Sequence, residues 1–325
     1  MLFRSVESSQ ETLLSRIIRL RLGYDDASDD APRSVIFKSS HPERLDATSD
    51  GGYNEVSFYA EVATDMPEGI VPGCFEAHWD RGSNAWHLVL EDLTNSHSIA
   101  TTEPIPPTQP QCEGIVRALA RVHAHWWDSP RLGTTVGRWQ DDGAMRRNIS
   151  EFATVFERFA SHLGDRLSVE RRVLYARFID AVPRLLTQRY QSHRNMTVVH
   201  GDAHLWNFFL PRDGGREIRI FDWQNWRIGF ASTDLAYMMA THWYPERRRR
   251  MEQPLLDHYH AAIQEHGVHD FDRAALGQDY RLAVLFQLMR LVWQFNAGLT
   301  PWVWWDHLER VVLAIDDLGC RELLP

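Results

Sequence analysis

Residues 198–224 carry the strongest functional pattern in the chain, VVHGDAHLWNFFLPRDGGREIRIFDWQ. An apolar pair at 198–199 leads into a polar loop, and a second apolar run at 208–210 precedes Asp213-Gly-Gly, which is typical of a tight hairpin turn. A second strand follows the turn. The hairpin is therefore expected to gather three oxygen-bearing side chains at one end: Asp202, Asn207 and Asp222.

These donors are of the kind that Mg²⁺ accepts. Carboxylate and amide oxygens are hard ligands, and Mg²⁺ usually keeps waters and substrate phosphates in its remaining octahedral positions. The hairpin therefore predicts a site for phosphoryl transfer. Two other interpretations stay open: a solvated polar turn, and a metal-dependent hydrolase, because His200-x-Asp202-x-His204 places alternate side chains on one strand face.

The spacing within this stretch is specific. Asp202 precedes Asn207 by the step found in the catalytic loop of protein kinases, and Asp222 follows at a later strand end. In HGDAHLWN at 200–207 and DWQ at 222–224, the chain resembles the aminoglycoside phosphotransferase and choline kinase-like family, the small-molecule branch of the protein-kinase fold. The resemblance implies that Asp202 orients or deprotonates the acceptor hydroxyl, and that Asn207 and Asp222 are Mg²⁺ ligands.

Lys38 is the only lysine in the chain, beside 34 arginines, and it lies in a predicted strand that begins at Ser34. A compact ammonium here suggests a specific site rather than general surface charge. In the helix predicted for residues 52–62, Glu55 shares a face with the apolar side chains and should point inward, where a carboxylate needs a partner. Lys38 is the predicted partner, and the resemblance implies that it holds the nucleotide phosphates.

Residues 86–93, WHLVLEDL, predict a short buried strand that ends in acidic residues. The resemblance implies that this strand leads into the hinge that binds the nucleotide base, with Glu91 and Leu93 as the expected contacts. The following residues, 94–111, are rich in proline and cannot form a regular helix or a central strand. The lobe boundary is expected at the start of this segment.

The remainder of the chain is predicted to be mostly helical. Apolar residues recur at helical spacing, and the expected helices cover residues 115–126, 168–190, a segment opening at Asp234, 252–266, 273–297 and 304–318. In the resembled fold the acid at position 234 anchors the catalytic-loop backbone, although a plain N-cap role is equally open. Most of the 13 tryptophans should lie in the core. The candidate acceptor contacts are His204, Trp206 and Trp226.

The composition of the chain limits the classes of protein and of partner that are compatible with it. The chain has 325 residues, 44% of them apolar and 24% charged, which is typical of a globular protein, and its three cysteines form no C-x-x-C pair. We expect a cytoplasmic protein without disulfides, since no signal-peptide or membrane-spanning segment is evident. The net charge is −9, and residues 1–94 carry 8 basic against 17 acidic residues. Such a surface disfavours nucleic acid as a partner.

The chain departs from the resembled family at its beginning. The phosphate loop expected between the first two strands contains no glycine, only Ser8-Ser-Gln-Glu-Thr12. Hydroxyls and backbone amides can still contact phosphate, but the permissive backbone of glycine is missing. Because the chain starts just before this segment, the sheet is also expected to lack an edge strand.

Together these features predict an α+β, bilobal, protein-kinase-like fold. Residues 1–93 would form a small, mainly antiparallel nucleotide-binding lobe, and residues 94–325 an α-rich lobe for catalysis and acceptor binding. The predicted activity is an ATP-dependent phosphotransferase acting on a hydroxyl of a small molecule, with Mg²⁺ as cofactor, GTP as an alternative donor and an antibiotic as one possible acceptor. A non-catalytic scaffold of the same fold is the alternative. Either a monomer or a homodimer is compatible with the sequence.

Overall fold

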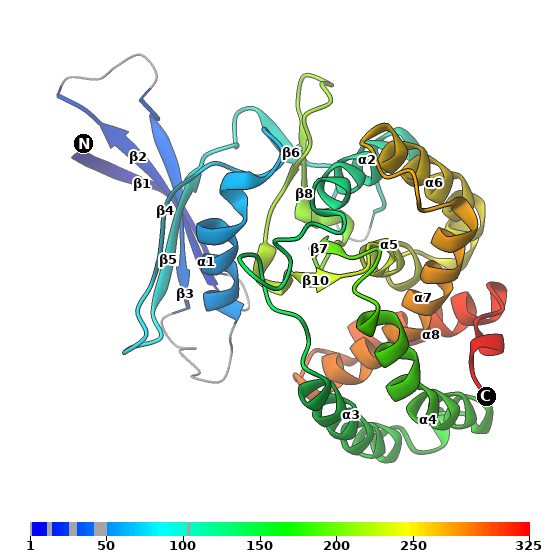
Figure 1. The fold of residues 1–325 in the computed structure, drawn as a ribbon. Coiled ribbons are helices and arrows are strands. Elements are labelled where there is room, and N and C mark those ends of the chain that lie inside the picture. Colours follow the sequence, from blue (N-terminus) through cyan, green and yellow to red (C-terminus); the bar gives the residue numbers. More distant parts are fainter. Residues whose placement is uncertain (1, 12–14, 26–30, 42–50, 103–104) are drawn as a thin grey trace. The chain divides into compact units, whose positions relative to one another are not determined.

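The computed structural model describes residues 2–11, 15–25, 31–41, 51–102 and 105–325. The chain divides into two compact units, which Figure 1 shows as ribbons. Unit 1 comprises Met1–Ala118 and Leu205–Trp226, and unit 2 comprises Leu119–His204 and Arg227–Pro325. The division thus falls within helix α2 (Gln109–Trp126) rather than after residue 93, and the hairpin segment that begins at Leu205 belongs to unit 1.

Unit 1 is built on a five-stranded antiparallel sheet with the strand order β1-β2-β3-β5-β4. Its strands are β1 (Leu2–Glu11), β2 (Ser15–Gly23), β3 (Ser34–Ser40), β4 (Cys74–Trp79) and β5 (Trp86–Glu91). The strands predicted from residue 34 and at 86–93 correspond to β3 and β5. These two are neighbours in the sheet, so Lys38 lies opposite Leu88 on an interior strand.

The first segment of the chain differs from its prediction. Ser8 to Glu11 are not a loop but the end of β1, which pairs with β2 from Leu2↔Gly23 to Glu11↔Arg16. The sheet therefore has the edge strand that the sequence was expected to lack. Residues 5–10 are all exposed, so they show no apolar alternation, and the backbone ladder rather than side-chain burial makes them a strand. Thr12 lies outside the described residues.

Helix α1 (Gly51–Glu61) provides the core of unit 1, and a short 3₁₀ turn, η1 (Ala63–Asp65), follows it. Phe58, Tyr59 and Val62 are buried, as the helical pattern predicts. The Phe58 ring stacks on Trp223 of the 3₁₀ turn η4 (Trp223–Asn225), with ring centroids 4.1 Å apart and planes within 5°. The helix is thereby packed against the segment that follows Asp222.

A second, three-stranded sheet in unit 1 has the order β6-β8-β9. It consists of β6 (His97–Ile99), β8 (Phe208–Pro211) and the two-residue β9 (Arg219–Ile220), with the 3₁₀ turn η3 (Leu205–Asn207) before β8. The predicted hairpin is present, but its connection is residues 212–218 rather than a tight turn. Asp213 accepts a hydrogen bond from the Gly215 nitrogen, and Gly214 has φ +76°, so the Asp-Gly pair turns the chain within this longer loop.

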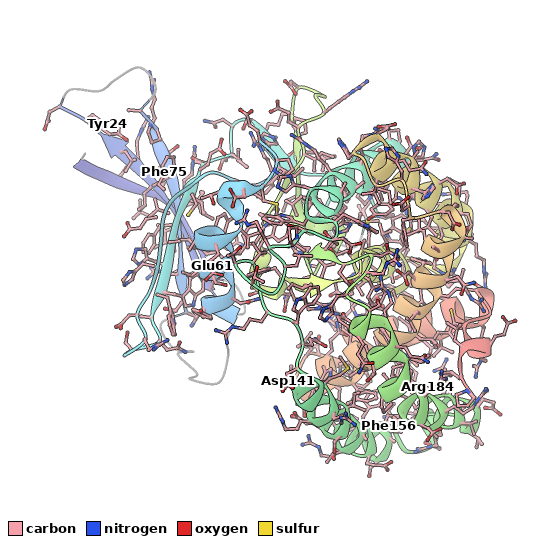
Figure 2. All side chains as sticks on the ribbon, in the orientation of Figure 1. Tyr24, Glu61, Phe75, Asp141, Phe156 and Arg184 are labelled. Atoms are coloured by element: carbon pink, nitrogen blue, oxygen red, sulfur yellow. The ribbon has the colours of Figure 1, made fainter. Side chains whose placement is uncertain are left out.

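Unit 2 is α-rich, and α2 (Gln109–Trp126) enters it from unit 1 (Figure 1). Helices α3 and α4 pack through stacked rings of Phe156 and Tyr175, whose centroids lie 4.4 Å apart; Phe156 is labelled in Figure 2. A two-stranded sheet pairs β7 with β10. The elements are α3 (Asp142–Leu163), the 3₁₀ turn η2 (Gly164–Arg166), α4 (Val169–Gln191), β7 (Thr197–Val199), β10 (Arg227–Gly229), α5 (Ser232–Ala236), the π-helix η5 (Tyr237–Thr241), α6 (Pro245–Glu265), α7 (Arg273–Asn296), α8 (Pro301–Asp317) and η6 (Cys320–Leu323).

The helix starts follow from local chemistry. Side-chain oxygens of Asp141, Ser168 and Asp272 accept backbone N–H bonds at the starts of α3, α4 and α7. Proline occupies the first turn of α6 and α8, where no intrahelical donor is required. The α+β class predicted from the sequence is confirmed by the antiparallel sheet of the N-terminal region and the helical C-terminal part.

None of the helices in the described ranges combines the length and the apolar character that crossing a lipid bilayer requires.

The stacked pair in unit 1 makes a testable contribution to stability. Replacing Phe58 by alanine removes a fully buried ring from between α1 and Trp223 and should lower the free energy of unfolding by about 3–5 kcal/mol. The matched control is Phe75→Ala on β4, where the residue is 57% exposed and the change in unfolding free energy should stay within about 0.5 kcal/mol. Urea denaturation followed by tryptophan fluorescence measures both, and equal losses would refute the packing role of Phe58.

Candidate active site

The ion pair predicted between Lys38 and Glu55 is present in unit 1. Lys38 Nζ, on β3, lies 2.9 Å from Oε1 and 2.7 Å from Oε2 of Glu55, on α1. Lys38 is 9% exposed and Glu55 1%. Since an isolated charge at this depth would be strongly destabilised, each group requires the other, and the pair sets the position of α1 along the sheet.

Asp222 completes this cluster, because its Oδ1 lies 2.8 Å from Lys38 Nζ. Burial alone would lower the pKa of Lys38, but the carboxylates of Glu55 and Asp222 outweigh it and raise that pKa. The lysine therefore stays protonated, and its stabilising contribution is lost only in strongly alkaline solution, as the pH rises through the raised folded-state value. Two carboxylates share one ammonium here, which favours a further cation.

The backbone at Asp222 is held in an unusual conformation, with φ 66° and ψ 57°. This left-handed region is uncommon for a residue with a side chain, and where it persists the surrounding structure enforces it, often at functional sites. Asp222 lies between β9 and η4, so the turn directs its carboxylate toward Lys38.

Asn54 is a site residue that the sequence did not reveal. Its Nδ2 donates to the backbone oxygens of Gln224, at 2.8 Å, and Trp226, at 3.1 Å. In return, Trp226 Nε1 donates to the Asn54 carbonyl at 2.7 Å. Asn54 precedes Glu55 on α1, so the same turn of helix that holds Lys38 also clamps the loop after Asp222. The partners lie about 170 positions away in the sequence, and no local pattern identifies them.

Asn207 lies at the end of η3 and is 4% exposed. The Phe221 nitrogen donates to the Asn207 carbonyl at 3.2 Å, which continues the pairing of β8 with β9. Asn207 and Asp222 are therefore at the same end of the hairpin, whereas Asp202, the third side chain of that prediction, belongs to unit 2. An amide and a carboxylate in this position fit the hard oxygen donors that Mg²⁺ selects.

Asp202 lies in unit 2, in the loop after β7, and the backbone of this loop is anchored by Asp234 of α5. The Asp234 carboxylate is fully buried and accepts from the backbone nitrogens of His200, at 2.7 Å, and Gly201, at 2.8 Å. His123 Nε2 lies 3.2 Å from the same carboxylate. The anchoring geometry expected for position 234 is thus present, rather than an N-cap alone.

Burial alone would raise the pKa of Asp234, but the bonds from His123, the charge effects of the two histidines and the Gly201 amide outweigh it and lower that pKa. Asp234 therefore remains ionised in the core at neutral pH. Because the folded-state value lies below that of the unfolded chain, the stabilisation is present above about pH 4 and is lost as the pH falls further.

Asp202 itself faces three side chains of unit 2. Arg290 NH1, on α7, lies 3.3 Å from Oδ1, and His204 Nε2 lies 3.7 Å from Oδ2. Tyr237, on η5, lies next to the same carboxylate, which helps to raise the pKa of its hydroxyl. Neither Arg290 nor Tyr237 was predicted from the sequence.

The remaining candidate residues have the following places. Glu91 donates its backbone N–H to the Gly73 carbonyl and accepts from the Gly73 nitrogen through Oε2 at 3.0 Å. Leu93 is buried, and its carbonyl accepts from the backbone nitrogens of Ser96 and His97. Trp206 is half-buried in η3, and Trp226 is 5% exposed and packed on α1. Their nucleotide or acceptor roles remain predictions.

The metal-hydrolase interpretation finds no ligand set in the described part of the chain, where no three His, Cys, Asp or Glu side chains are grouped as a metal centre would require. His200 is fully buried, and its Nδ1 accepts a hydrogen bond from the backbone nitrogen of Asp202 at 3.2 Å.

The anchoring carboxylate gives a pH-dependent prediction. Asp234→Asn leaves one acceptor oxygen for two backbone donors. The free energy of unfolding at pH 7 should therefore fall by about 3 kcal/mol. This difference in unfolding free energy between the variant and the parent should narrow below about pH 4, because the unfolded parent chain then takes up a proton on Asp234 and the stabilisation from its charge is lost. Urea titrations at pH 7 and at progressively lower pH measure this, with the exposed Asp270→Asn as control. A gap that is constant with pH would contradict the charge argument.

Comparisons with known proteins agree with this fold. A microcompartment-associated aminopropanol kinase superposes with a TM-score of 0.59 at 14% identity, over 98% of this chain and 92% of that chain. The GDP complex of wild-type aminoglycoside 2'-phosphotransferase-IIIa gives 0.57 at 14%, over 98% and 94%. Choline kinase LicA from Streptococcus pneumoniae gives 0.55 at 12%, over 98% and 94%.

At these identities the likeness establishes the fold, which is that of small-molecule kinases. No curated protein sequence matches the chain. The family model of the ecdysteroid kinase-like family matches residues 9–269, most of the chain. The chain therefore belongs to the ecdysteroid kinase-like family.

Proposed function

We propose that this protein transfers the γ-phosphate of a magnesium-bound nucleotide to a hydroxyl group of a small molecule. The observation that carries the proposal is the cluster of Asp222 with the buried Lys38 and Glu55, with Asn207 at the same end of the hairpin. One ammonium among two carboxylates supplies a contact for phosphate and a place for a divalent cation. ATP is the expected donor and GTP the alternative, since a structurally similar protein is a GDP complex.

Each residue has a defined part in the proposed reaction. Lys38, held by Glu55, would bind the nucleotide phosphates, and Asn207 and Asp222 would hold Mg²⁺. The ion, when bound, neutralises charge on the phosphates. Asp202 would orient the acceptor hydroxyl for in-line attack and take its proton. Positioning and electrostatics account for most catalysis of this kind, so no covalent intermediate is required.

The acceptor is proposed as a small-molecule alcohol. The similar structures are named for aminopropanol, choline and aminoglycosides, and the family for ecdysteroids. Because one fold serves many acceptors, the acceptor has to be found by assay. An antibiotic of the aminoglycoside type belongs in the panel beside simple amino alcohols, sugars and steroids.

The first test removes the proposed base. Asp202→Asn keeps the side-chain shape but cannot accept the hydroxyl proton, so turnover should fall by about 1,000-fold or more while the Kd for Mg-ATP changes little. ADP release over the acceptor panel and calorimetric titration measure the two quantities. Asp213→Asn, at the exposed hairpin tip, is the control and should behave as the parent. Turnover of Asp202→Asn at the parent rate would remove Asp202 from the proposed mechanism.

The second test concerns the clamp on the Asp222 loop. Asn54→Leu is close in size but loses two donated hydrogen bonds, so Mg-ATP binding should weaken by about tenfold as Asp222 and Glu55 become less ordered. Calorimetry measures the Kd, and Asn148→Leu, at an exposed site on α3, is the control. If both variants bind Mg-ATP as the parent does, Asn54 has no part in the nucleotide site.

A non-catalytic nucleotide-binding scaffold is the second candidate. The observation that favours it is the absence of glycine from residues 8–12, of which Ser8 to Glu11 form part of β1. This candidate predicts Mg-ATP binding with no phosphate transfer to any compound of the panel.

A further inference from the structure

We infer that Arg290 and Tyr237 are the positioning residues of the Asp202 carboxylate, and that they direct its Oδ2, beside His204, toward the acceptor hydroxyl. The inference rests on the proposed function and states which residues of unit 2 orient the reactive oxygen of Asp202. All four residues belong to unit 2. Neither Arg290 nor Tyr237 lies within the HGDAHLWN or DWQ motifs.

Arg290 contacts the loop that carries Asp202 at two points. Its NH1 lies 3.3 Å from Asp202 Oδ1, and its NH2 donates to the Gly201 carbonyl. A guanidinium presents these two N–H groups in one rigid plane, so it fixes the carboxylate relative to the backbone of the preceding residue. The flexible ammonium of a lysine could provide the charge but not this geometry.

Tyr237 supports both partners. The carbon of the Arg290 guanidinium lies 3.9 Å from the centre of the Tyr237 ring, a cation–π contact. Asp202 and Arg290 both act on the Tyr237 hydroxyl, because Asp202 raises its pKa and Arg290 lowers it. Burial and, next, the charge of Asp202 raise the pKa of Tyr237, so the hydroxyl stays protonated beside the carboxylate.

The helix geometry is consistent with a positioning role. Tyr237 begins the π-helical turn η5, and π turns occur frequently at functional sites. Asp234 lies three residues earlier and binds the nitrogens of His200 and Gly201. One continuous helical segment therefore fixes the loop backbone through Asp234 and the carboxylate through Tyr237.

This arrangement makes the two oxygens of Asp202 unequal. Oδ1 faces Arg290, whereas Oδ2 lies 3.7 Å from His204 Nε2. An acceptor hydroxyl that approaches on the His204 side would meet Oδ2, with Oδ1 already oriented. We therefore assign Oδ2 as the oxygen that receives the acceptor proton.

The test compares Arg290→Gln, Arg290→Lys and Tyr237→Phe with a matched control. In the parent, Arg281 on α7 likewise bridges a backbone carbonyl, that of Gly319, and a carboxylate, that of Glu322, so Arg281→Gln removes a similar interaction elsewhere on the helix. For Arg290→Gln we expect kcat to fall about 100-fold, with the KM for Mg-ATP within about twofold of the parent. Arg290→Lys should recover part of the loss, Tyr237→Phe should lose about tenfold, and Arg281→Gln should turn over as the parent.

A crystal structure of the Arg290→Gln variant provides the second readout, which does not depend on turnover. The Asp202 carboxylate should rotate or become disordered while the Asp234 anchor remains. If the parent turns over no acceptor, the proposed function fails, and this structure still tests the positioning. An Asp202 carboxylate that keeps its place in Arg290→Gln, or kcat unchanged in that variant, would overturn the inference.

Discussion

The ammonium of Lys38, held between Glu55 and Asp222, is the constraint on which unit 1 depends. A buried ammonium requires carboxylate partners, and these come from a helix and from a turn far apart in the sequence. Meeting this requirement brings β3, α1 and the loop after β9 together. The Asn54 clamp and the stack of Phe58 on Trp223 strengthen the same junction with a polar and an apolar contact.

Unit 2 also contains a buried charge that needs partners, and here the charge is negative. The carboxylate of Asp234 is buried, and it is stabilised by backbone amides of the loop that carries Asp202 and by His123. Because the amides belong to the loop, the charge organises the loop backbone in addition to binding the His123 side chain. The loop shape is thus set from the core, which leaves the Asp202 side chain to be oriented separately by its neighbours.

Several features could be predicted from the sequence because each imposes a local physical requirement. An inward-facing Glu55 needs a cation, and Lys38 was the evident choice in a chain with one lysine. The pairing of the segments around Asn207 and Asp222 followed from the apolar runs that flank an Asp-Gly turn. The long helices of unit 2 showed helical apolar spacing, although α3 (Asp142–Leu163) was not anticipated.

Other features could not be predicted, because their partners are determined only by the tertiary structure. Arg290 is one of 34 arginines, and nothing in its neighbourhood indicates a contact with a residue 88 positions earlier. Asn54 donates to backbone carbonyls, which every residue type has, so the sequence does not indicate its partners. Strand β1 was missed because its exposed side chains lack alternation, and its register is set by the ladder with β2.

The solitary lysine also has a chemical consequence. With every other basic side chain an arginine or a histidine, the side-chain primary amines of this protein reduce to a single nitrogen, and that nitrogen is buried in an ion cluster. Covalent acylation of a lysine side chain, whether by a laboratory reagent or by a cellular acyl donor, can therefore occur at one position only and must first separate Lys38 from its two carboxylates.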